Sequence, residues 1–112
     1  MAKTQVVWVL QTDVENVGVE YWIYSSEALA FANAARLLRH WMKEYPLAIA
    51  DVAKEVRKLL QSGIIAHVRK AIDKWNAEQE NQNSPRELTV TDETLDVDMG
   101  LAIRNGAADT IG

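Results

Sequence analysis

The sequence predicts an α+β fold, with a three- or four-stranded antiparallel sheet covered on one face by two or three helices. Two observations predict it: strand-like alternation lies near the two ends of the 112-residue chain, and helical periodicity is confined to its middle. This segregation is typical of α+β proteins and differs from repeating strand–helix–strand folds. The expected order is β-β-α-α-(α)-β-(β), in one domain over residues 1–103, with 104–112 as a mobile C-terminal tail.

Two apolar segments near the N-terminus predict a β-hairpin. Residues 4–12 and 19–24 are rich in valine and aromatic residues, which favour strands. The polar connection between them contains Gly18, which can adopt the positive φ of a tight turn. Alternation places Trp8 on one face of the hairpin with Val6 and Leu10. The second face is equally apolar and is formed by Val7, Val9, Tyr21 and Ile23.

That second face is the first candidate partner-binding surface. If helices cover the first face, the second presents a large apolar patch to solvent. Such patches usually bind another protein or a second copy of the same chain.

A helix is predicted to begin after Ser25-Ser26 and to end before Pro46. A serine hydroxyl at the start can accept a hydrogen bond from a free backbone N–H of the first turn. A residue that precedes proline is pushed out of helical ψ, which explains the end. The apolar residues recur in steps of three and four and form one contiguous face. They are Phe31, Ala34, Ala35, Leu38, Trp41, Met42 and Tyr45.

Residues 47–79 contain two apolar stripes that point in different directions on a single straight helix. Gly63 lies between the stripes, and glycine is favoured just past a helix end. Two helices, over about 47–61 and 63–79, are therefore preferred to one kinked helix. Further on, residues 87–91 alternate as a third strand, and the pattern of 95–99 allows a fourth.

The formal net charge of −4 is unevenly distributed. Residues 36–74 carry nine basic and four acidic side chains, whereas residues 75–112 carry two basic and eight acidic ones. Within the basic segment Arg36, Arg39 and Lys43 follow i, i+3, i+7 spacing, so they lie along one face of the first helix. This stripe is the second candidate partner-binding surface, suited to an acidic protein or to phosphates.

Several classes of protein are excluded or unsupported. The absence of cysteine excludes disulfide scaffolds, thiol nucleophiles and cysteine-based metal sites. The two histidines, His40 and His67, lack metal-ligand spacing, and the scattered glycines form no phosphate-binding loop. No apolar run approaches the ~18 residues that span a bilayer. We therefore expect no catalytic residues, no cofactor, no metal, no membrane association and a cytoplasmic location.

These observations predict a small, non-catalytic interaction or regulatory protein that binds another protein or itself. The alternative is an anion or nucleic-acid binder that uses the basic helices of residues 36–74. An isoelectric point of about 5.1 disfavours nucleic acid as the main ligand, because nucleic-acid binders usually carry a net basic footprint.

Overall fold

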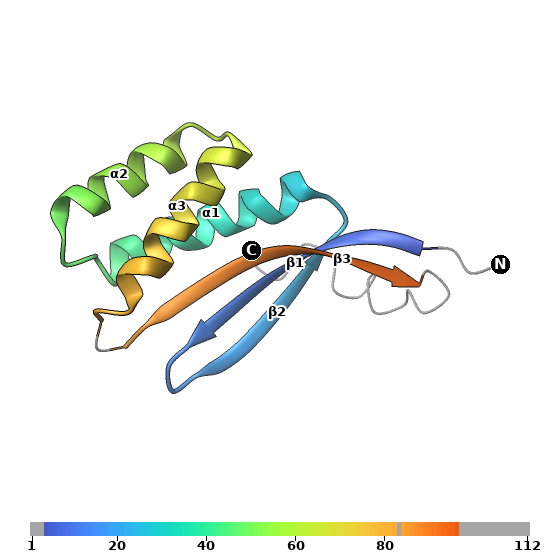
Figure 1. The fold of residues 1–112 in the computed structure, drawn as a ribbon, viewed down its shortest axis with the longest axis horizontal. Helices are drawn as coiled ribbons and strands as arrows, with labels where there is room; N and C mark the ends of the chain where they lie inside the picture. Colours follow the sequence, from blue (N-terminus) through green and yellow to red (C-terminus); the bar gives the residue numbers. More distant parts are fainter. Residues whose placement is uncertain (1–3, 83, 97–112) are drawn as a thin grey trace.

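The computed structural model describes residues 4–82 and 84–96, and it confirms the α+β prediction. A three-stranded antiparallel sheet carries three helices on one face, in the order β-β-α-α-α-β (Figure 1). The elements are β1 (Thr4–Val14), β2 (Gly18–Tyr24), α1 (Glu27–Glu44), α2 (Ala50–Gln61), α3 (Ile65–Gln79) and β3 (Arg86–Asp96).

The strand β1 is central in the sheet, whose order is β2-β1-β3. The hairpin turn closes through a hydrogen bond from the Val17 N–H to the Val14 carbonyl (3.0 Å), with positive φ at Asn16 and Gly18. The ladder between β1 and β3 is longer than the ladder between β1 and β2. Residues 4–7 and 93–96 therefore form a two-stranded ribbon beyond the end of β2 (Figure 1).

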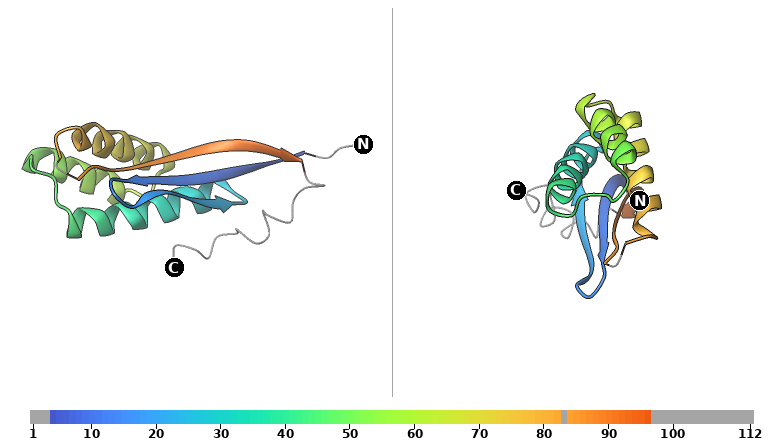
Figure 2. Two further views of the ribbon diagram at one scale, coloured as in Figure 1. Left: turned by 90° about the horizontal axis from the view of Figure 1, so that it is seen from below. Right: turned by 90° about the vertical axis from the view of Figure 1, so that its left-hand side faces the viewer.

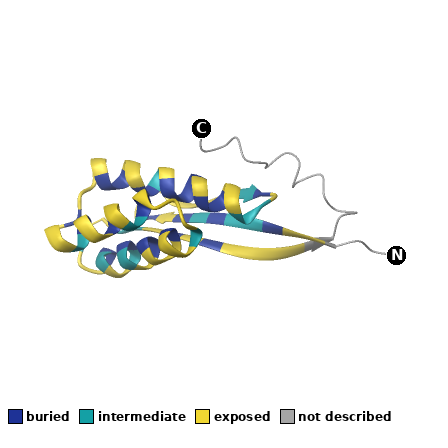
Figure 3. Cartoon of the chain, turned by 90° about the horizontal axis from the view of Figure 1, so that it is seen from above, coloured by how far each residue is buried: buried dark blue, intermediate teal, exposed yellow. Residues whose placement is uncertain are grey.

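The three helices form a helical layer on one side of the sheet, with α1 and α3 next to the strands. Helix α1 contacts all three strands, and α3 contacts β3 and α1. Helix α2 packs mainly on α3, farther from the sheet (Figure 2). Each helix has a buried stripe and an exposed outer side (Figure 3), as the predicted amphipathic periodicity requires. Among the described residues, no helix combines the length and apolar character needed to cross a membrane.

The core lies between the helices and the strand face that carries Leu10. The rings of Trp41 and Trp75 are 6.0 Å apart within it, and Trp8 contacts Phe31 at the edge of the helical layer, with ring centroids 6.2 Å apart. Both pairs tilt their rings, as aromatic pairs prefer. Trp41 and Trp75 are buried, and Trp8 and Trp22 are half-buried, so all four tryptophans pack in or against the core.

Residues 50–79 form two helices, as preferred from the sequence. Gly63 separates α2 from α3 with a φ of 70°, a conformation that suits glycine at a helix end. Helix α2 begins at Ala50, three residues later than expected, because Leu47 is buried outside the helix and Ile49 has extended backbone angles.

Three details of the sequence interpretation differ from the structure. Tyr45 was expected on the buried face of α1, but it follows the helix end and is 45% exposed, with the Arg86 guanidinium 3.6 Å from its ring centroid. Val6 is half exposed, since the helical layer ends near Trp8. Strand β3 runs unbroken through 92–94, because these residues pair with the β1 ribbon. Residues 95 and 96 of the possible fourth strand belong to β3, and the rest of that strand and the tail at 104–112 lie outside the described residues.

Candidate functional site

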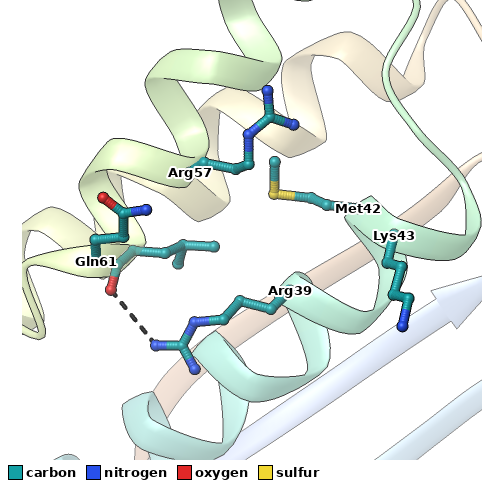
Figure 4. Close-up of a pocket in the computed structure, with 6 residues that line it drawn as sticks. Arg39, Met42, Lys43, Arg57 and Gln61 are labelled. Atoms are coloured by element: carbon teal, nitrogen blue, oxygen red, sulfur yellow. Dashed lines mark hydrogen bonds between the residues drawn. The ribbon is translucent and has the colours of Figure 1, made fainter.

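The most distinctive surface feature is a groove between α1 and α2, which we call the basic groove (Figure 4). Its volume is about 280 Å³. Helix α1 contributes Arg39, Met42 and Lys43, spaced so that they share one side of the helix. Helix α2 contributes Arg57, Leu60 and Gln61.

The floor of the basic groove is apolar and its rim is cationic. Met42 and Leu60 are buried and form the floor. The side chains of Arg39, Lys43 and Arg57 are exposed and surround Met42, with their charged ends directed away from one another (Figure 4). This divergent arrangement differs from a cage around a single phosphate. It suits a larger partner that places one apolar group on the floor and carboxylates around it.

Among the described residues, no acidic side chain lines the basic groove. Ion pairs of the described residues lie elsewhere: Lys74 pairs with Glu55 at 3.2 Å, and Arg69 contacts Glu27 at 3.8 Å. Within the groove, the Arg39 guanidinium donates one long hydrogen bond to the Leu60 carbonyl (3.5 Å; Figure 4). The positive charge of the rim is therefore not neutralised by a described carboxylate.

The structure places the predicted basic stripe on the exposed side of α1, but it divides the stripe between two hollows. Lys43 lies in the basic groove, whereas Arg36 lines a neighbouring hollow of about 380 Å³ between α1 and the start of α3. Arg39 lines both. Arg57, on α2, completes the rim of the basic groove. The sequence shows that Arg57 lies in the basic segment, but its position across the groove from Lys43 depends on how α1 and α2 pack.

The apolar hairpin face, which was the first predicted surface, is also assembled in part. Val9 and Ile23 lie opposite each other in the β1–β2 register, on the sheet face away from the helices, and both are half-buried. Tyr21 lies on the same face and is 62% exposed. Val7 shares this face by register but is fully buried, so it does not belong to the accessible patch.

A second polar cluster joins α3 to β3 and has a different character. The Asn76 amide both donates to the Leu88 carbonyl (2.7 Å) and accepts from the Leu88 N–H (3.1 Å). The Trp75 indole N–H donates to the Arg86 carbonyl (2.6 Å), and the Arg86 N–H donates to the Gln79 side chain (3.0 Å). These side chains satisfy the outer backbone groups of β3 and hold the helix on the sheet, which is a structural role.

The other candidate groups form no catalytic arrangement within residues 4–82 and 84–96. The His67 ring nitrogen Nδ1 lies 2.9 Å from the Ser62 hydroxyl. That hydroxyl also donates to the Leu59 carbonyl and accepts from the Ile64 N–H, so it bridges the end of α2 and the start of α3. The described residues also contain no group of three or more side chains suited to hold a metal ion.

Comparison of the chain with family models, curated proteins and solved structures found no match. The geometry of the surfaces is therefore the basis for the functional interpretation.

Proposed function

We propose that the protein is a small, non-catalytic interaction protein that binds an acidic segment of a partner protein in the basic groove. One observation carries this proposal: three cationic side chains surround an apolar floor, and none of the described lining residues is acidic. Unpaired charge around an apolar centre resembles the organisation of protein–protein interfaces, in which an apolar core is enclosed by a polar rim.

The distribution of charge over the molecule favours a protein segment over nucleic acid. The three helices carry nine basic and six acidic residues, whereas the three strands carry one basic and six acidic residues. A long polyanion that extended past the helical layer would meet the acidic sheet. A short acidic segment could remain within the groove.

The expected affinity is modest and sensitive to salt. An exposed ion pair contributes about 0.2–1 kcal/mol, so three such pairs give little without a further contribution. Burying one aliphatic side chain on Met42 and Leu60 adds about 1.5–3 kcal/mol. We therefore expect weak binding that requires both the carboxylates and the central apolar residue of the partner.

Fluorescence anisotropy with designed peptides tests the proposal. The probe is a labelled peptide with one leucine flanked by glutamates; the comparison peptides replace either the glutamates by glutamine or the leucine by serine. We expect the first peptide to bind, and each comparison peptide to bind at least about tenfold more weakly. Raising the salt concentration should weaken the binding, because it screens the exposed pairs.

A matched pair of variants locates the site. The double variant Lys43→Glu/Arg57→Glu reverses two charges of the rim and should reduce the affinity by more than about tenfold. The control, Lys54→Glu/Lys70→Glu, makes the same change of net charge at exposed positions outside the groove lining. Equal losses in both variants would contradict the proposal, since they would indicate general attraction. Tighter binding of a single-stranded oligonucleotide than of the acidic peptide would favour the nucleic-acid alternative.

A further inference from the structure

Within residues 4–82 and 84–96, no strand pairs with the outer edge of β2. In an antiparallel sheet, the N–H and C=O of successive residues point alternately to the two sides of a strand. The Val17 N–H donates to the Val14 carbonyl, so the backbone groups of Val14 point toward β2, as do those of every second residue before it in β1. These residues pair with the even-numbered residues of β2, whose backbone groups point back toward β1. The backbone groups of Val19, Tyr21 and Ile23 therefore point outward, away from β1.

The side chains along this edge are mainly apolar and carry little charge. Val19 is 45% exposed and Tyr21 is 62% exposed. Glu20 is the one charged residue of β2, and it lies on the opposite face of the strand from Tyr21. An exposed strand edge with this composition readily pairs with another strand unless charge or a covering element prevents it.

The other outer edge, on β3, has both kinds of protection. The backbone groups of Arg86 and Leu88 are occupied by side chains of α3. Farther along, Asp92 and Glu93 are exposed. Antiparallel pairing of two β3 strands centred on Asp92 would place carboxylates opposite each other, which destabilises a strand pair. The two edges of the sheet therefore differ in their capacity to accept a second copy.

We infer that the β2 edge binds the β2 edge of a second copy of this chain, in antiparallel register about a two-fold axis at Tyr21. This register places Tyr21 opposite Tyr21 of the second copy and Val19 opposite Ile23 of the second copy. Glu20 then lies opposite Trp22 of the second copy, so no like charges are directly opposed. The two three-stranded sheets would join into one six-stranded sheet, and the apolar face of each copy would continue into the other.

The inference is independent of the proposed function, because the basic groove lies in the helical layer and contributes no residue to this edge. The Lys43→Glu/Arg57→Glu variant should therefore retain the dimer. A chain that dimerises but does not bind the acidic peptide would contradict only the proposed function. A chain that binds the peptide but remains monomeric would contradict only the dimer.

Analytical ultracentrifugation of Tyr21 charge variants tests the register directly. The wild-type chain, of 12.6 kDa, should sediment with twice that mass. The variants Tyr21→Lys and Tyr21→Glu should each sediment as monomers, because the two-fold axis places like charges opposite each other. An equal mixture of the two should regain the dimer mass, because opposite charges then meet across the axis.

The control is Thr91→Lys, which adds a charge to the same sheet face on β3 and should leave the dimer intact. A monomeric wild type at about 0.1 mM would overturn the inference. Dimeric Tyr21→Lys, or failure of the mixture to associate, would also overturn it. Loss of the dimer in the Thr91→Lys control would indicate stacking of sheet faces and would overturn edge pairing.

Amide hydrogen exchange of the wild-type protein keeps the test decisive if a Tyr21 variant does not fold. The amides of Val19, Tyr21 and Ile23 should exchange at least about tenfold more slowly at high than at low protein concentration. The Val90 amide, which by alternation points outward on β3, should show no such dependence. Equal exchange of the β2 amides at both concentrations would overturn the inference.

Discussion

The junction between α3 and β3 contains neutral polar side chains, whereas the basic groove between α1 and α2 contains cationic ones, and the two regions use them differently. At the junction, Trp75, Asn76 and Gln79 are matched with backbone donors and acceptors of β3. In the groove, Lys43 and Arg57 have no ion pair with a described carboxylate. Polar groups that are satisfied within the chain stabilise the fold, whereas charged groups left unpaired around an apolar floor are available to a partner.

This comparison leads to predictions that separate stability from binding. Changes at the junction should lower the free energy of unfolding and leave the surface of the groove unaltered. Changes at the rim of the groove should leave the free energy of unfolding nearly unchanged and weaken the binding of a partner.

Replacing Trp75 by alanine should be the most damaging change. The side chain is fully buried, its ring packs at a tilt against that of Trp41, and its indole N–H donates to the Arg86 carbonyl. Deleting it leaves a cavity and an unpaired carbonyl, so we expect a loss of about 3–5 kcal/mol in the free energy of unfolding, measured by urea denaturation. Trp75→Phe should cost less, because it fills most of the cavity. A loss below about 1 kcal/mol for the alanine variant would contradict the role of this residue in the core.

Replacing Asn76 by alanine tests the hydrogen bonds of the junction with little change in volume. It leaves both backbone groups of the buried Leu88 without their partner, which should cost about 1–3 kcal/mol. The control is Asn81→Ala, an exposed residue near the end of α3, which should change stability by less than about 0.5 kcal/mol. Equal effects of the two changes would mean that the edge of β3 does not need its side-chain partners.

The sequence predicted the local elements well, because their causes are local. Ser26 at the start of α1, Pro46 after its end and Gly63 between α2 and α3 act on their own backbone neighbourhood. The details that differ also involve contacts between distant segments. Tyr45 fits the apolar stripe of α1, but the helix ends before it and Arg86, distant in the sequence, covers its ring.

The candidate site was predictable on one helix and unpredictable between helices. The spacing of Arg39 and Lys43 placed both on one side of α1. The packing angle of α2 brings Arg57 to the same groove, and it cannot be read from periodicity. The two hydrogen bonds between Asn76 and the backbone of Leu88 were equally unpredictable, because they depend on how β3 is aligned beside α3.

Removing the N-cap of α1 should have an intermediate effect on stability. The Ser26 hydroxyl accepts a hydrogen bond from the Leu29 N–H at 3.2 Å. We expect Ser26→Ala to lower the free energy of unfolding by about 1 kcal/mol and Ser25→Ala to lower it by a few tenths. Peptide binding in the groove should be retained, because the groove lies at the opposite end of α1. Equal effects of the two serine changes would show that the cap does not stabilise the helix.

The smallest effect on stability should come from the rim of the groove. Lys43→Ala and Arg57→Ala remove exposed side chains without a described ion pair, so each should change the free energy of unfolding by less than about 0.5 kcal/mol. Each should nevertheless weaken binding of the acidic peptide several-fold, which anisotropy titration measures.

Met42→Ala is the comparison variant, because it removes part of the apolar floor of the groove and part of the core together. It should lower both affinity and stability. If Lys43→Ala destabilised the protein as much as Met42→Ala, the rim would be structural, and the distinction between the groove and the α3–β3 junction would no longer hold.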